Sequence, residues 1–229
     1  MKNLLLFTVL SLLTITAYAQ CNDFFPIKNG TEWTFENYNA KGKSTGKNHQ
    51  TVTAFTSTGS GFNATLNSVM YNEKGKELTK GDLLVSCDNG IITMDMRKFI
   101  PEEQYKAFGA TEVKVESENL QFPAKLAVGQ SLNDGEITIT AVGSQIPMTM
   151  NVAISERTVE AKETITTPAG TFECYKIKSK MHIKNHMGIS MNFDFSAIEW
   201  LAPNGGMIKS ESYNKNGKLV GSTLLIEKK

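Results

Sequence analysis

The sequence lacks the signatures of several common chemistries. It has no Gly-x-Ser-x-Gly nucleophile elbow, and no glycine-rich loop follows a strand and opens a helix to hold phosphate. Asp194 and Glu199 could in principle act as an acid/base pair, but nothing in the sequence sets the separation of their carboxylates. We therefore expect a protein that is not an enzyme and has no catalytic residues.

An excess of charge of one sign is also missing. The chain has 24 basic and 23 acidic residues, so it offers no general attraction to nucleic acid. Of the three histidines, His182 and His186 are four apart, which on one strand face separates them by about 13 Å. Only a turn between them would allow a zinc site, so two solvated histidines are the default. We expect no metal, no cofactor and no nucleic-acid partner.

Cysteine is scarce, with Cys21, Cys87 and Cys174 as its three copies. In an oxidising compartment two of them are expected to pair and one to remain. Cys21 lies in a segment that would fray without a bridge, Cys87 precedes a turn signal, and Cys174 lies in a predicted strand as a buried thiol would. We favour the Cys21–Cys87 pairing, and the other two pairings stay open because sequence does not set connectivity.

One long apolar run is present, at the N-terminus. Lys2 precedes residues 4–13, which are mostly Leu, Phe and Val, and Ala17-Tyr18-Ala19 is a small-x-small cleavage signal. We predict a signal peptide over residues 1–19, cleaved between Ala19 and Gln20, and no transmembrane segment in the mature chain. Lipidation of Cys21 is the less favoured alternative, because Gln20 stands where a lipoprotein signal has a small residue. The expected location is periplasmic, secreted or on the cell surface.

Strand signals dominate the mature chain. From Met181 to Phe195 apolar residues alternate with polar ones, and the same period of two runs from Ile146 to Ile154. Such alternation predicts strands with one buried and one wet face, with a hairpin turn near 185–188. The further strand candidates are Glu32–Tyr38, Thr51–Thr56, Phe62–Tyr71, Leu83–Cys87, Ile91–Met96, Thr111–Glu116, Glu136–Val142, Thr158–Thr166, Thr171–Lys180, Gly206–Tyr213 and Val220–Ile226.

The fold class that follows is mainly β, with curved antiparallel sheets in a half-barrel or sandwich-like arrangement. One short helix is expected near 100–108, where Pro101 suits a first helical position and Gly109 a stop. Residues 20–229 form one all-β domain, with a possible junction between two lobes near 120–135. No pattern in the sequence predicts the oligomeric state.

A short motif occurs three times, as Tyr38–Lys43, Tyr71–Lys76 and Tyr213–Lys218. In each copy an Asn follows the Tyr and a Gly precedes the final Lys, which is typical of a hairpin turn. A repeated basic ligand contact is the alternative. We favour three hairpin tips with solvated lysines. The copies are also unequally spaced, which argues against a solenoid.

Methionine is the most unusual residue type, with ten copies in the chain. Several of them occupy the same alternate positions of the predicted strands as Ile and Phe. They therefore belong to apolar faces rather than to a copper site. Such faces can line an adaptable apolar pocket. The residues expected to line it are Met148, Met150, Met181, Met191, Phe193 and Phe195.

The order of several segments resembles the TapB-like group of exported proteins from Gram-negative bacteria, which is related to an uncharacterised DUF family. The segments are Cys21–Pro26, the Tyr-Asn-x-Lys-Gly-Lys motif, Cys87 ahead of Met94-Asp95-Met96, Thr167–Lys176, Ile198-Glu199-Trp200 and Gly205–Tyr213. The resemblance covers the mature chain. It implies an envelope or secreted protein with curved antiparallel sheets, and it implies no established activity.

Two functions remain after these exclusions. The first is a non-catalytic envelope protein that binds a lipid or another hydrophobic ligand on a Met-rich concave sheet. The second is a structural or protein-interaction module of the cell surface without a ligand cavity. A cavity in the folded chain would discriminate between them, because fold alone does not fix function.

Overall fold

The computed structural model describes Cys21, Phe24 and residues 27–95, 112–123, 125–143 and 148–229. These residues form strands and connections, with no helix among them. The strands are β1 (Glu32–Asn39), β2 (Ser44–Ser57), β3 (Gly61–Asn72), β4 (Glu77–Asp88), β5 (Ile91–Met94), β6 (Glu112–Glu118), β7 (Leu120–Pro123), β8 (Gly135–Val142), β9 (Met148–Thr167), β10 (Gly170–Met187), β11 (Ile189–Ala202), β12 (Gly206–Asn214) and β13 (Leu219–Lys228).

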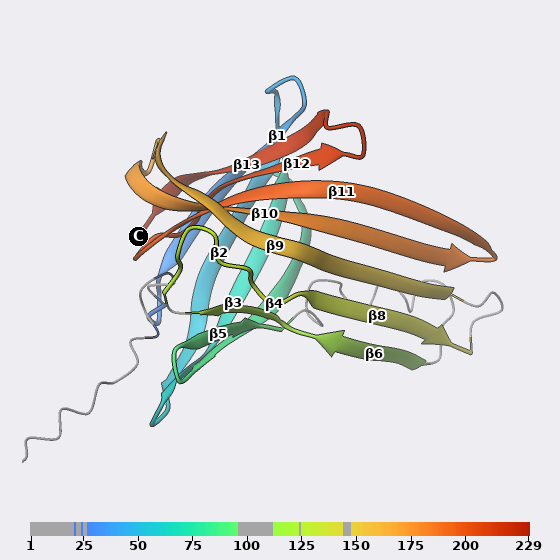
Figure 1. Cartoon of the computed structure of the whole chain (residues 1–229), viewed down its shortest axis with the longest axis horizontal. Coiled ribbons are helices and arrows are strands. Elements are labelled where there is room, and N and C mark those ends of the chain that lie inside the picture. Colours follow the sequence, from blue (N-terminus) through green and yellow to red (C-terminus); the bar gives the residue numbers. More distant parts are fainter. Residues whose placement is uncertain (1–20, 22–23, 25–26, 96–111, 124, 144–147) are drawn as a thin grey trace, which may run out of the picture.

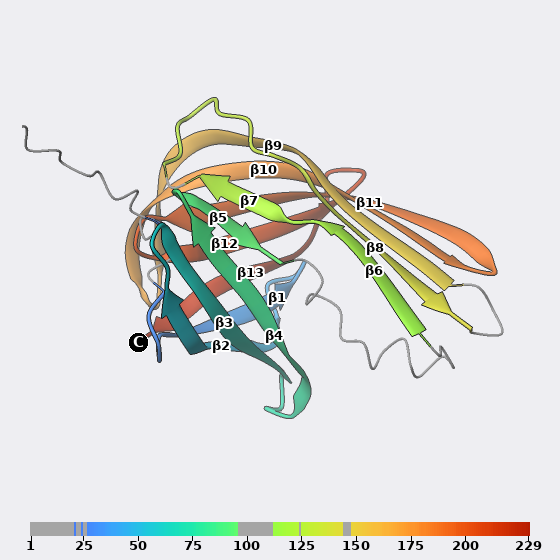
Figure 2. The same cartoon turned by 90° about the horizontal axis from the view of Figure 1, so that it is seen from below.

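All thirteen strands belong to one antiparallel sheet that is nearly closed. The strand order is β6-β8-β9-β10-β11-β12-β13-β1-β2-β3-β4-β5-β7. The two strands at its ends, β6 and β7, are consecutive in the chain and separated only by Asn119. β6 pairs with β8 at one end of the sheet, and β7 pairs with β5 at the other end. Because β6 and β7 follow each other in the chain, the two ends of the sheet lie close together (Figure 2).

The sheet has two parts, a barrel and an arm that extends from it (Figure 1). We define the arm as β6, β8 and residues 148–154, 181–187 and 189–195 of β9, β10 and β11. The β10–β11 hairpin turns at Gly188, whose φ of 73° is a left-handed conformation that glycine adopts without strain. The hairpin turn predicted near 185–188 is therefore confirmed, with Gly188 as its turn residue.

In two places, two segments that were predicted as separate strands form one long strand. Residues 148–154 of the predicted strand 146–154 and the predicted strand 158–166 are parts of β9. In the same way, β10 joins Thr171–Lys180 to the first half of the alternating run. Between the two parts of β9, Glu156 has a φ of 51°, and the register with β10 shifts near Lys178. An irregularity of this kind bends a strand without ending it, so the strand passes from the arm into the barrel wall.

The interior of the barrel is apolar. Alternate residues of the barrel strands point inward and are buried, because successive side chains of a strand point to opposite faces. The core residues with a relative exposure of 0% are Ile27, Ile92, Val159, Cys174, Ile177, Ile208 and Leu225. Trp33 and Trp200 are buried as well.

The three copies of the Tyr-Asn motif form three hairpin tips, between β1 and β2, β3 and β4, and β12 and β13. In the second copy the Asn72 side-chain oxygen accepts hydrogen bonds from the backbone N–H groups of Lys74 and Lys76, at 2.9 and 3.0 Å. Asn39 and Asn214 make the same pair of bonds. The glycine of each copy has a φ between 72° and 77°. The turn prediction is therefore confirmed at all three positions.

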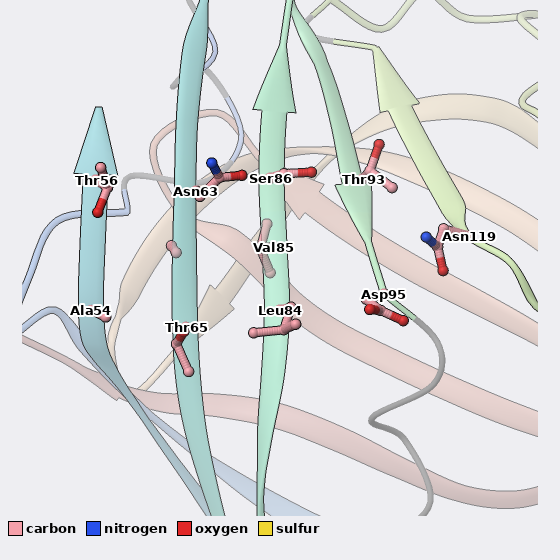
Figure 3. A pocket seen from close by; sticks show the side chains of 11 residues that line it. Ala54, Thr56, Asn63, Thr65, Leu84, Val85, Ser86, Thr93, Asp95 and Asn119 are labelled. Carbon is pink, nitrogen blue, oxygen red and sulfur yellow. The ribbon is translucent and has the colours of Figure 1, made fainter. Parts of the chain in front are cut away.

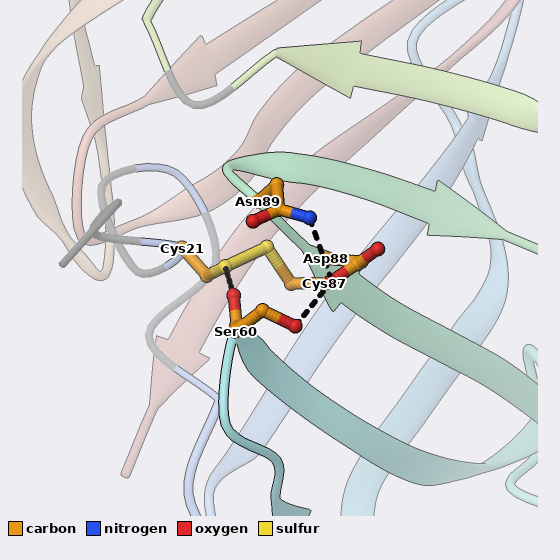
Figure 4. Close-up of a disulfide and its surroundings, with 5 residues drawn as sticks. All are labelled: Cys21, Ser60, Cys87, Asp88 and Asn89. Atoms are coloured by element: carbon orange, nitrogen blue, oxygen red, sulfur yellow. Dashed lines mark hydrogen bonds between the residues drawn. A yellow bond between two sulfur atoms is a disulfide. The ribbon is translucent and has the colours of Figure 1, made fainter.

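A disulfide joins Cys21 to Cys87, the pairing favoured from the sequence, and Cys174 is a buried free thiol (Figure 4). The Cys21 sulfur lies 3.7 Å from the backbone carbonyl oxygen of Ser60. The Phe24 ring meets Tyr175 of β10 edge-on at a centroid distance of 5.6 Å. The segment before β1 is thus held to two separate strands.

Several predictions fall outside the described residues. The signal peptide over 1–19, its cleavage between Ala19 and Gln20, and the helix near 100–108 stay predictions. The span 120–135 contains β7 and the single bridge between Ser131 and Thr158, and its role as a junction also stays a prediction. Among the described residues, no helix is long and apolar enough to cross a membrane.

Candidate functional site

The six residues expected to line a pocket lie on one face of the arm. Directly opposite residues of antiparallel strands point to the same side of the sheet. Met181 of β10 lies opposite Ile154 of β9 on one side and Phe195 of β11 on the other. The same pairing places Met148 beside Met187, Met150 and Met191 on either side of Asn185, and Phe193 beside Ile183. We call this surface the apolar arm face.

Burial on the apolar arm face decreases toward β11. Ile137 and Ile139 of β8 are buried, the residues of β9 are mostly half-buried, and residues 189–194 of β11 are exposed. The exposed fraction is 76% for Ile189, 44% for Met191 and 45% for Phe193. Large apolar side chains grouped on an exposed surface are typical of an interaction site.

The barrel contains a partly open apolar cavity of about 270 Å³. Most of its lining is aromatic or aliphatic, and two polar residues, Gln50 and Glu199, complete it. The apolar lining residues are Trp33, Phe35, Leu66, Leu83, Val85, Met94, Leu120, Phe122, Ile154, Leu201 and Met207. None of the six predicted residues lines this cavity, which no local pattern in the sequence indicates.

Ile154 belongs to both apolar surfaces. It lines the barrel cavity, and it is the cross-strand neighbour of Met181 on the arm. Met181 in turn neighbours Phe195. The apolar lining of the cavity therefore continues onto the apolar arm face without an intervening charged residue in this row.

Glu199 is the ionisable group of the cavity lining. The side chain of Glu199 is half-buried, and no hydrogen bond or ion pair joins its carboxylate to another described residue. Burial in the barrel raises its pKa above the ordinary value of 4.5, and the nearby positive charge of Arg157 opposes that rise only in part. The acid is thereby shifted toward its neutral, proton-carrying form.

Arg157 of β9 is 2% exposed and connects the two ends of the sheet. Its Nη1 donates to the backbone carbonyl oxygen of Gln121 in β7 at 3.0 Å and to that of Asn133 before β8. Its guanidinium lies 4.4 Å from the ring centroid of Phe122, which lines the cavity. Nη2 is buried without a hydrogen-bond partner, and burial lowers the Arg157 pKa.

A second hollow, of about 440 Å³, lies over strands β2 to β5 (Figure 3). A row of small polar side chains crosses it, formed by Thr56, Asn63, Ser86 and Thr93 at paired positions. Asp95 stands at its edge as the one acidic lining residue. This lining carries no cysteine, histidine or lysine that could serve as a nucleophile or base.

The remaining candidate groups do not converge. His182 and His186 lie on the polar face of the arm, where His182 Nδ1 is 2.7 Å from Asp194 and His186 Nδ1 is 2.9 Å from Ser190. Asp194 and Glu199 differ in strand parity, so they point to opposite faces of β11 and cannot form an acid/base pair. In the described ranges, no three His, Cys, Asp or Glu side chains are placed to hold a metal.

One sequence signal could have revealed Glu199. The odd-numbered residues of β11 from Ile189 to Leu201 are apolar or small except for Glu199. A charged residue at one inward position of such a strand is a candidate functional group, because burying an unpaired carboxylate is costly. What the pattern does not reveal is that this position faces a cavity.

The fold and these surfaces define an all-β, barrel-like protein of the kind found among exported proteins. The chain belongs to the DUF3108-like family, whose model matches residues 28–225. This match supports the coarser part of the resemblance, an uncharacterised DUF family, and the TapB-like name stays a prediction. No curated protein matches the chain.

Two solved structures share the fold. One is a Bacteroides fragilis NCTC 9343 protein assigned as exported with a YmcC-like fold, 25% identical, with a TM-score of 0.72 over 91% of this chain and 100% of that one. The other, assigned as a lipoprotein of Parabacteroides distasonis ATCC 8503, is 27% identical, with a TM-score of 0.72 over 91% of this chain and 99% of that one. Both assignments are consistent with a place in the cell envelope.

Proposed function

We propose that this protein is a non-catalytic protein of the cell envelope that binds an apolar ligand, such as a lipid, in the barrel cavity and along the apolar arm face. The observation that carries the proposal is the continuity of the two surfaces through Ile154 and Met181. A cavity of about 270 Å³ is slightly smaller than the usual pocket for a drug-sized ligand. A longer chain would therefore fill the cavity and continue along the arm.

Two features support ligand binding over a merely structural role. A fully packed barrel would have no apolar cavity, since protein interiors are normally packed to crystal-like density. The exposed Met191 and Phe193 would also gain by contact with a chain, at about 25 cal/mol for each Å² removed from water. Flexible Met side chains suit a ligand of variable shape.

The experiment uses the mature protein purified from its native envelope. Mass spectrometry of an organic extract is expected to recover a co-purifying lipid, and the stripped protein is expected to bind a fluorescent fatty-acid probe. Met207→Trp should reduce probe binding because the larger ring occupies the cavity that Met207 lines. Met191→Gln should weaken it by making the arm face more polar.

Met70→Gln is the matched control, because Met70 has an exposed fraction of 40%, close to that of Met191, and lies on β3 away from the arm. An extract without lipid, together with no probe binding by the stripped protein, contradicts the proposal. Equal losses of probe binding in Met191→Gln and Met70→Gln would mean that the apolar arm face is not part of the binding site.

A specific observation favours a second candidate, a protein-interaction module. Residues 189–194 of β11 pair with β10 on one side, and among the described residues they have no strand partner on the other. This edge carries no lysine, arginine or proline, whereas the open edge of β6 carries four charged residues in seven. Unprotected apolar edges favour pairing with another strand. Concentration-dependent association that Ile189→Lys abolishes would favour this candidate.

A further inference from the structure

Resting on the proposed function, we propose that the barrel cavity selects amphiphiles that carry one carboxylic acid, with Glu199 bound to that acid through a shared proton. The cavity lining supplies apolar contacts for the chain and two polar side chains, Glu199 and Gln50. No other residue of the lining is ionisable. The chemistry of Glu199 therefore decides which head group the cavity accepts.

The Glu199 carboxyl group has no protein partner to satisfy it. The side chain of Glu199 is half-buried against the apolar cavity lining, and an ionised carboxylate without a partner is disfavoured there, which shifts Glu199 toward the neutral acid. A neutral carboxyl group has one O–H donor and remaining acceptor capacity. In an apolar cavity a ligand is the natural partner for that donor, and a carboxylate oxygen is the strongest acceptor it can meet.

Charge balance favours an anionic ligand over a cationic one. Arg157 places a buried guanidinium close enough to Glu199 to affect its ionisation. The other charged group that acts on Arg157 is Asp134, which is exposed and therefore screened by water. With Glu199 neutral, the barrel interior keeps one positive charge, and a ligand carboxylate neutralises it. An ammonium ligand would instead add a second positive charge.

Arg157 acts on the ligand through its field and not by contact. Its Nη1 is occupied by two backbone carbonyls, its Nη2 is buried, and Arg157 is not among the residues that line the cavity. An arginine with one unpaired buried nitrogen is costly to the fold. A positive potential in the barrel interior near Glu199 is a function that would explain this cost.

The test compares three ligands with the same eight-carbon chain: octanoic acid, octanol and octylamine. Isothermal titration of the stripped, full mature protein should show octanoic acid binding about tenfold or more tightly than octanol, as a charge-assisted hydrogen bond is expected to give. Octylamine should bind most weakly. Glu199→Leu should abolish the preference for the acid while it leaves octanol binding in place, which also shows that the variant is folded.

Two further variants test whether the side chain of Glu199 itself recognises the ligand acid. Glu199→Gln keeps a hydrogen-bond donor, so it should retain part of the acid preference. Affinity for octanoate should fall with rising pH in the wild type, because an ionised Glu199 repels the ligand, and this fall should be absent in Glu199→Gln. Glu227→Gln removes an exposed acid that is paired with Lys229 and should behave as the wild type.

The outcomes distinguish the two proposals. Equal binding of octanoic acid and octanol, or an acid preference that survives in Glu199→Leu, overturns the assignment of Glu199 and leaves apolar binding intact. If none of the three ligands binds the wild type, both the selectivity and the binding function on which it rests are overturned.

Discussion

Replacing both Cys21 and Cys87 by alanine is expected to lower the free energy of unfolding by about 4 kcal/mol. The two cysteines are 66 residues apart in sequence. A cross-link of this span reduces the entropy of the unfolded chain, and the loop-entropy relation gives about 4 kcal/mol for it at 25 °C. Both positions are buried, so alanine is chosen because serine would add a buried hydroxyl group.

Equilibrium urea unfolding of the mature protein measures this loss, with and without a reductant. For a chain of this size, 4 kcal/mol corresponds to a fall in Tm of about 8–16 °C. The reduced wild type should approach the double variant. In both, Cys174 should resist alkylation until the protein unfolds, because burial raises the pKa of its thiol to about 11.

Two results would refute this reasoning. A loss below about 1 kcal/mol would mean that the bridge constrains the unfolded chain far less than its span implies. Peptide mapping that links Cys174 to either of the other cysteines would overturn the pairing itself. A supporting observation is faster proteolysis near Phe24 and Ile27 in the variant, since the bridge holds the segment that contains these buried residues.

The remaining predictions concern a close approach, a turn and a buried acid. Gly61→Ala should destabilise the protein by about 1–3 kcal/mol, because its Cβ would lie 2.1 Å from a backbone oxygen of β4, whereas Gly59→Ala meets nothing within 4 Å and should be neutral in the same urea titration. Asn72→Ala should cost about 1–2 kcal/mol of unfolding free energy, since two backbone N–H groups lose their acceptor; a thermal shift indistinguishable from wild type would argue against the turn's contribution. The pKa of Glu199 is raised in the folded state, so the wild-type protein should lose stability as the pH rises above the ordinary carboxyl value of 4.5. Glu199→Gln removes this loss and should therefore stabilise the ligand-free protein at neutral pH. Parallel pH profiles of stability for the wild type and this variant would contradict that assignment.

The sequence by itself determined the local features. Asn and Gly at fixed places in the Tyr-Asn motif specify a left-handed turn residue and a side-chain acceptor, so the hairpin tips followed from chemistry within six residues. Alternation from Met181 to Phe195 specified one apolar face, because the side-chain period of a strand does not depend on the rest of the fold. The placement of all six predicted residues on the apolar arm face reflects this.

Only the tertiary structure decided which of these faces enclose space. The prediction treated 120–135 as a possible junction and missed β7, because four residues are too few to carry a periodic signal and their pairing with β5 depends on closure of the whole sheet. The bends that join predicted strands into β9 and β10 also depend on register with neighbours far away in the chain. The cavity that holds Glu199 exists only because β1 to β5, β7, β9, β11 and β12 curve around a common interior. Periodicity is a local property, whereas curvature and closure arise from long-range strand pairing.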